Sequence, residues 1–223
     1  MDLALDDDLP VVRDALHQQV AQRLRKLLVE GTLPAGAKLN ERVLCEQLGI
    51  SRTPLREAIR LLAAEGMVTL EPGRGAFAPR LTREEVLNTF DVIAELEGLA
   101  GERAAARVTD TALSELQALQ YDMQAAFERR DLQAYYAANA QVHDWLSRLA
   151  DNPVLRQTWQ QLNRRLHALR FRSNQDEVKW AHALDEHAQM LRALKARDGQ
   201  AMRRLLVEHL RRKRDAVLEQ IAG

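Results

Sequence analysis

The sequence predicts a mainly α-helical protein in two parts, a small module of short elements followed by a bundle of long helices. Proline and glycine interrupt helices, and five of the six prolines and six of the ten glycines fall within the first 80 residues. The charge changes at the same place. Residues 9–80 hold eleven basic and seven acidic side chains, a net charge of +4, whereas residues 81–223 hold 21 of each. We therefore expect one domain over 9–80 and a second over 81–223.

Composition excludes several kinds of protein. The chain has 223 residues, enough to bury a core without a disulfide or a metal. Its one cysteine, Cys45, cannot form a disulfide within the chain. Equal numbers of acidic and basic side chains, 32 of each, exclude a strongly charged nucleic-acid or membrane binder. No apolar run approaches the roughly 20 residues of a membrane helix. We expect a soluble cytoplasmic protein without a membrane partner.

Three short helices are predicted in the first part. Apolar residues at positions 20, 24, 27 and 28 recur at helical spacing and predict a helix that ends near Gly31. The same spacing predicts a second helix over about 40–48 and a third over 51–65. Between these two, Gly49 is placed to end one helix in a left-handed cap, and Ser51 is placed to begin the next.

Two very short strands are predicted after the third helix. The pattern changes there to Val68 and Leu70, a turn over residues 72–75, and then Phe77. Apolar residues on both sides of a turn with two glycines predict a β-hairpin. Three helices and a hairpin in this order form a winged helix-turn-helix.

The predicted third helix carries arginines on one face. Arg52, Arg56 and Arg60 are each four residues apart, so they project to the same side. Amides at a helix N-terminus attract phosphate, and a guanidinium group can bind O6 and N7 of guanine in the major groove. Arg74, between two glycines at the hairpin tip, can reach an adjacent groove or phosphate. The alternative is a solvated helix face, but the preceding turn and the following hairpin favour DNA binding.

One stretch is specific enough to indicate a family. Residues 39–62 have the sequence LNERVLCEQLGISRTPLREAIRLL, and Glu-Gly and Gly-Arg-Gly follow at 65–66 and 73–75. With these motifs, residues 12–80 resemble the GntR family of bacterial transcription regulators. Members of that family bind short inverted repeats as dimers. The resemblance therefore implies a double-stranded DNA operator and a homodimer.

The resemblance also assigns roles to residues. In the family, arginines at the positions of Arg42, Arg52 and Arg56 contact the operator, with residues at the positions of Thr53 and Gly73 beside them. Together with the arginine of the hairpin tip and the residue that begins the third helix, the predicted DNA-binding set is Arg42, Ser51, Arg52, Thr53, Arg56, Gly73 and Arg74.

Six helices are predicted in the second part. Thr82 and Glu85 have the spacing of a capping box, which marks the start of the first one. Polar and proline-containing boundaries divide the rest of the chain. The predicted helices cover residues 82–107, 110–129, 132–149, 153–171, 177–196 and 200–222. This bundle resembles the ligand-binding FCD domain of the FadR-like branch, in its six-helix, VanR-like type.

Four side chains match a metal-binding pattern of the resembling domain. Asn139 and His143 are four residues apart on the third helix of the bundle, while His187 and His209 lie on the fifth and sixth. In the resembling domain, an Asp or Asn four residues before a histidine binds a divalent metal with two later histidines. Three imidazoles suit zinc or nickel. Because Asn139 is neutral, we expect weaker binding than with a carboxylate. The alternative for each histidine is a hydrogen-bonded core residue or a surface residue.

The sequence indicates only the chemical class of the effector that the bundle binds. Many relatives carry an arginine on the first helix of this domain, where this chain has Ile93. Arginines of the fourth helix can substitute for it, and the candidates are Arg164 and Arg170. The alternative interpretation is that these two arginines belong to a solvated helix face. We expect a small-molecule effector, with organic acids as the candidate class. The basic run at 211–214 is interpreted as a solvated turn.

These observations predict a ligand-responsive, DNA-binding transcription regulator of the repressor type. A direct sensor of divalent metal is the alternative. A purely architectural DNA-binding dimer is a second one, and a zinc enzyme with bound water as nucleophile is a third. The sequence contains no HExxH motif, nucleophile elbow or phosphate-binding loop, so we expect no enzymatic activity.

Overall fold

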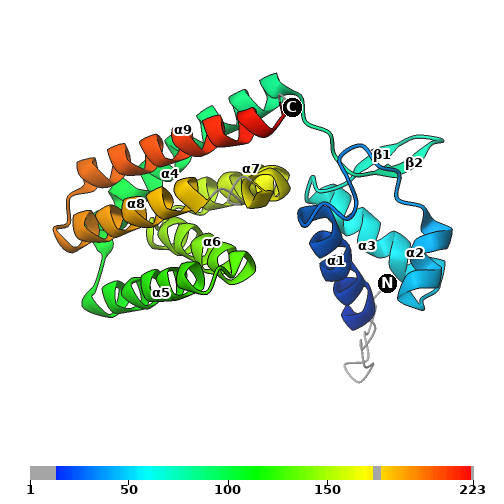
Figure 1. The fold of residues 1–223 in the computed structure, drawn as a ribbon, viewed down its shortest axis with the longest axis horizontal. Helices are drawn as coiled ribbons and strands as arrows, with labels where there is room; N and C mark the ends of the chain where they lie inside the picture. The colour runs from blue at the N-terminus through cyan, green and yellow to red at the C-terminus, as the bar shows by residue number, and fades with distance from the viewer. Residues whose placement is uncertain (1–13, 173–176, 222–223) are drawn as a thin grey trace, which may run out of the picture. The chain divides into compact units, whose positions relative to one another are not determined.

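The computed structural model describes residues 14–172 and 177–221 (Figure 1). These residues form two compact units that divide between Arg80 and Leu81. The first domain was predicted to begin at residue 9, and its first five positions lie outside the described residues. Each unit has its own buried core.

The described part of the first unit contains three helices and a hairpin. Its helices are α1 (Asp14–Val29), α2 (Glu41–Leu48) and α3 (Arg52–Ala64). Strands β1 (Thr69–Glu71) and β2 (Gly75–Phe77) pair antiparallel, with Leu70 opposite Ala76. This order confirms the predicted winged helix-turn-helix, in which the hairpin is the wing.

Local chemistry sets the tight turn between α2 and α3. The Asn40 side chain accepts hydrogen bonds from the backbone amides of Arg42 and Val43, which caps α2 at its start. Gly49 ends α2 at φ +65°, in the left-handed region that glycine adopts without steric cost. Ser51 has the extended backbone of an N-cap residue, but its side chain makes no capping hydrogen bond. The predicted boundary is therefore right, although the serine hydroxyl does not stabilise it.

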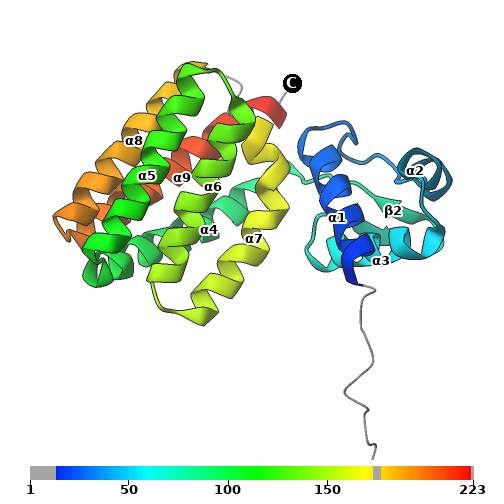
Figure 2. The ribbon, with the colours of Figure 1, turned by 90° about the horizontal axis from the view of Figure 1, so that it is seen from below.

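The second unit consists of long helices, as predicted. Figure 2 shows how they pack into one bundle, and α4 runs alongside α9. The Thr82–Glu85 capping box forms at the start of α4. The described helices of this unit are α4 (Arg83–Arg107), α5 (Asp110–Glu128), α6 (Leu132–Leu149), α7 (Pro153–Arg172), α8 (Glu177–Lys195) and α9 (Gly199–Ile221). None of the described helices is long and apolar enough to span a membrane.

Two glycines bring α4 and α9 close together. A Cβ atom built at Gly98 would lie 2.8 Å from Cγ2 of Val207, and one at Gly101 would lie 2.3 Å from Cδ1 of Leu206. Leu206 is fully buried, so it has little room to move away. The close approach matters for the site described below, because α4 and α9 each contribute side chains to it.

We expect Gly101→Ala to destabilise the helical unit by about 1–3 kcal/mol, because the new methyl group overpacks the α4–α9 contact. Helix propensity alone would act in the opposite direction, since alanine favours helices over glycine by ~1 kcal/mol. Calorimetric unfolding of the full chain measures the change. Ala106→Gly, at an exposed position of the same helix, is the matched control for propensity. A more stable Gly101→Ala variant would contradict the packing account.

Candidate functional site

The first candidate site is the exposed face of α3 in the first unit. Leu55, Ile59 and Leu62 are buried in the core of this unit. Arg52 and Arg56 project to the opposite side and are exposed, as the spacing predicts. The helix therefore separates an apolar packing face from a basic face, which is the arrangement that a groove-reading helix needs.

Acidic partners hold three of the predicted DNA-binding arginines. Arg56 Nε donates to Glu41 Oε2 at 2.9 Å, which links α3 to the first turn of α2. Arg42 Nη1 donates to Glu46 at 2.8 Å, and Arg74 pairs with Glu71 at the wing. All three arginines are exposed, so these pairs hold the side chains in place at little energetic gain. Two of the pairs are local, at i,i+4 and i,i+3, whereas Arg56–Glu41 joins two helices and depends on how they pack.

A hollow of about 410 Å³ lies between α3 and the wing. Arg56 and Arg60 line it from α3, and Gly73 lines it from the wing. Gly73 has φ +72° and no atom within 4 Å of a built Cβ, so it supplies backbone freedom and an open approach. Ser51 and Thr53 are exposed at the N-terminus of α3. The predicted DNA-binding residues thus lie on α2, the start of α3, and the wing.

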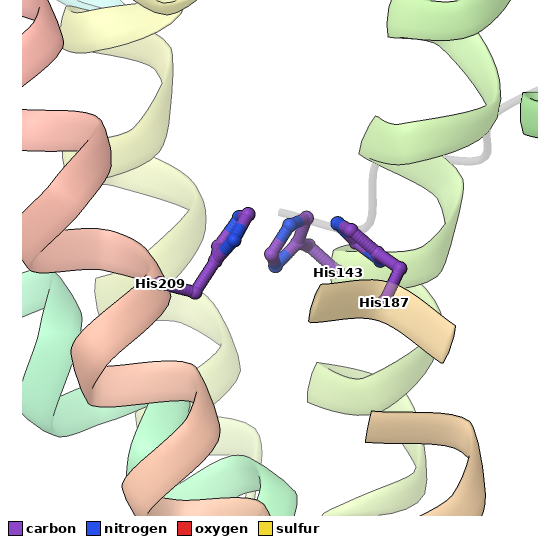
Figure 3. Close-up of side chains that lie close together, drawn as sticks. All are labelled: His143, His187 and His209. Carbon is purple, nitrogen blue, oxygen red and sulfur yellow. The ribbon is translucent and has the colours of Figure 1, made fainter. Parts of the chain in front are cut away.

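The second candidate site is a cluster of three histidines inside the helical bundle. His143 comes from α6, His187 from α8 and His209 from α9, and their rings face one another (Figure 3). Their ring centroids are 5.1–5.4 Å apart, and one nitrogen of each ring lies within 4.8 Å of the others. All three are buried, with at most 4% of each residue exposed.

Two buried carboxylates accept hydrogen bonds from the outer nitrogens of this cluster. Glu97 Oε2 on α4 lies 2.6 Å from Nδ1 of His143. Glu186 Oε2 on α8 lies 2.5 Å from Nδ1 of His209. An ionised carboxylate only accepts, so each Nδ1 carries the proton and the Nε2 atoms are left with lone pairs. This pattern of carboxylate, histidine and inward lone pair is typical of histidines that bind metal.

The pKa shifts in the cluster have identifiable causes. Burial raises the pKa of Glu97, but its interaction with His143, the charge of Arg170 and the hydrogen bond from Trp159 outweigh burial and lower the pKa to about 2. Burial, with the nearby charges of His209 and His143, holds the pKa of His187 well below its usual range. Burial also lowers the pKa of His209, against the opposing effect of Glu186. His187 and His209 are therefore neutral near pH 7, which is the form that binds metal.

The inner nitrogens of the cluster lack partners within the described residues. His143 Nε2 and both ring nitrogens of His187 are buried without a hydrogen bond. A buried polar atom without a partner costs free energy, so such atoms call for an explanation. Zinc–nitrogen bonds of 2.0–2.1 Å would place ligand nitrogens roughly 3.3 Å apart in a tetrahedron. The ligand nitrogens lie within 4.8 Å of one another, and their type and inward placement fit a divalent ion.

Three further predicted residues lie on α6 and α7. Asn139 is buried one turn before His143 on α6. Arg170 is buried, and its Nη1 lies 3.6 Å from Glu97 Oε1. Arg164 is exposed on α7, so the structure does not bring it together with Arg170. The basic run at 211–214 lies within α9 rather than at a turn, and Arg212 is exposed there while it pairs with the buried Glu186.

Glu97 and Glu186 have roles beside the histidines that the sequence pattern did not assign to them. The sequence did contain a signal for Glu97. Helical spacing assigns its position to the buried face of α4, and a buried glutamate needs buried partners. The sequence could not name those partners, since His143 and Trp159 lie 46 and 62 residues away. For Glu186, the neighbouring His187 drew attention to the segment, but only the structure shows its bond to His209.

Comparison with known protein families is consistent with both sites. Residues 16–78 match the family described as bacterial regulatory proteins of the gntR family. Residues 88–212 match the FCD domain. The first match contains the arginine face and the wing, and the second contains the histidine cluster with both carboxylates.

Individual relatives match along most of their length. The HTH-type transcriptional repressor RspR of Escherichia coli (strain K12) is 26% identical, covering 87% of this chain and 86% of the relative. The gluconate operon transcriptional repressor of Bacillus subtilis (strain 168) is 24% identical, covering 91% and 84%.

A solved structure of E. coli McbR/YncC superposes with a TM-score of 0.80 at 27% identity, covering 94% of this chain and 99% of that one. A putative GntR regulator from Rhodococcus sp. RHA1 shares the fold with a TM-score of 0.75 at 21% identity, covering 91% and 97%. The FCD match alone spans more than half of the chain. The chain therefore belongs to the GntR family of bacterial DNA-binding transcription regulators, with an FCD domain as its second unit.

Proposed function

We propose that the protein is a repressor that binds an inverted-repeat operator as a homodimer. The observation that carries this proposal is the exposed arginine face of α3 next to the wing, with Arg52 and Arg56 directed away from the core. Two relatives of similar length are named as repressors, which supports the direction of control. Two first units in a dimer would place two α3 helices about one helical turn of DNA apart.

We further propose that the bundle binds a divalent metal, zinc or nickel. His143, His187 and His209 would supply three nitrogens, and the side-chain oxygen of Asn139 is a fourth candidate ligand. The unpartnered inner nitrogens support this proposal, because a bound ion would satisfy them. When bound, the ion would act as a Lewis acid for an oxygen-donor ligand. The chain's own part is to hold neutral imidazoles in the buried interior of the bundle with their lone pairs facing inward.

The effector that we propose is a small oxygen-donor molecule, with organic acids as the first class to test. Ile93 is fully buried where many relatives carry an arginine, so a positive charge must come from elsewhere. Arg170 is the candidate, because it is buried inside the bundle whereas Arg164 is exposed; an effector would share its guanidinium with Glu97. The effector would shift a population between two placements of the DNA-binding units. It can do so only through its different affinities for the two placements.

A direct metal sensor is the second candidate function. The observation that favours it is that the three histidines come from three different helices, α6, α8 and α9. Binding an ion would therefore pin these helices together without any organic ligand. Operator affinity measured with and without metal, in the absence of small molecules, separates the two functions. A change of tenfold or more, about 1.4 kcal/mol, would favour the sensor.

We expect Arg56→Ala to remove the preference for the operator. A lost bidentate contact to guanine costs about 1–3 kcal/mol in discrimination. An operator selected from random duplexes by the wild-type protein, compared with a scrambled duplex at fixed salt, provides the measurement. Arg23→Ala on α1 removes the same charge from an exposed position of the same unit and serves as the control. If Arg56→Ala discriminated as well as Arg23→Ala, α3 would not be the recognition helix.

We expect His143→Ala combined with His187→Ala to remove bound metal, because one imidazole and one amide cannot hold the ion. Elemental analysis of dialysed protein, counted per chain, gives the result. His17→Ala in the first unit controls for the loss of a histidine elsewhere. Stoichiometric metal in the double variant would refute the site.

A further inference from the structure

We infer that Glu97 is the positioning residue of the metal centre: its carboxylate, itself held by Trp159 and Arg170 of α7, turns the His143 ring so that Nε2 faces the other two histidines. This inference rests on the proposed metal binding and adds to it a residue that is not itself a ligand. It concerns how the site is assembled before an ion arrives.

The hydrogen bond to Glu97 sets the direction of the His143 ring. Glu97 Oε2 and His143 Nδ1 are 2.6 Å apart, and at most 4% of either side chain is exposed. With water excluded, the ring cannot exchange this bond for a hydrated orientation at low cost. The proton on Nδ1 makes Nε2 the acceptor, and Nε2 has no hydrogen-bond partner within the described residues. The single bond to Glu97 thus fixes both the tautomer and the orientation of the ring.

Two residues of α7 hold the Glu97 carboxylate in place. Its other oxygen, Oε1, accepts a hydrogen bond from Trp159 Nε1 at 2.9 Å and lies 3.6 Å from Arg170 Nη1. A buried carboxylate is costly unless it is paired and hydrogen-bonded, and here Arg170 supplies the charge and Trp159 the bond. Both residues belong to α7, while Glu97 belongs to α4 and His143 to α6. One carboxylate therefore ties three helices to one ligand.

The three histidines differ in how their rings are held. Glu186 holds His209 in a similar way, but it also contacts Arg212 and the exposed His182, and it lines a surface pocket of about 270 Å³. His187 has no hydrogen bond to either ring nitrogen among the described residues. Glu97 is thus the more enclosed of the two carboxylates. It also acts on the histidine that follows Asn139 by one turn, where the neutral amide has removed a charge from the ligand set.

Glu97→Gln tests the inference, because it keeps the shape of the side chain and removes the charge. The amide can still accept from His143 only by turning its NH2 group toward the Trp159 and Arg170 donors. We expect zinc affinity, measured by competition with a chromophoric chelator, to fall about 10- to 100-fold. Glu102→Gln makes the same chemical change at a half-exposed position of α4 and should leave the affinity unchanged. Visible spectra of the Co²⁺-loaded variants report whether the ligand geometry changes.

A measurement on the wild-type chain keeps the test independent of how the variant folds. Nitrogen-15 chemical shifts of His143 should show the Nδ1-protonated tautomer in the metal-free protein and coordination through Nε2 after zinc is added. An Nε2-protonated tautomer, or zinc on Nδ1, would overturn the inference. So would a folded Glu97→Gln variant that binds zinc as tightly as the wild type, although metal binding itself would stand. If the wild type bound no metal, the proposed metal centre and this inference would both be wrong.

Discussion

The helical unit depends on one constraint, the need to keep an ionised carboxylate and three imidazoles inside an apolar bundle. Glu97 is almost completely buried, and it is tolerable there because His143, Trp159 and Arg170 surround it. Satisfying it requires α4, α6 and α7 to take fixed positions around one side chain. The close α4–α9 contact then places His209 opposite His143, with stacked rings 5.4 Å apart. The same contacts therefore determine both the packing of the bundle and the geometry of the candidate metal site.

The DNA-binding unit keeps its charged side chains at the surface instead of in its core. Its core is apolar, and its charges lie on the surface, where ion pairs such as Arg56–Glu41 hold side chains in place at little energetic cost or gain. A nucleic acid can displace or share such a pair, because both partners are already hydrated. The two units thus use charge differently: on the surface it is available to a partner, and in the bundle it is committed to positioning other groups.

Most of the fold could be predicted from the sequence, because it depends on local signals. Helix spacing, the Thr82–Glu85 capping box and the glycines at 49 and 73 act within a few residues. The three histidines could also be named, since a family pattern marks them. Glu97 and Glu186 could not, because their roles arise from contacts between helices that are far apart in the chain. Arg170 and Arg164 looked alike in the sequence, and only packing shows that one is buried and the other exposed.

X-ray absorption at the metal edge, on untagged protein purified without chelator, tests the central claim most directly. The account predicts about one zinc or nickel ion per chain, with at least three imidazole nitrogens at roughly 2.0–2.1 Å in its coordination shell. That result would mean that the histidine cluster is a metal centre and that Asn139 does not disable it. Protein with essentially no metal, or with an ion bound by fewer than three histidines, would contradict the account.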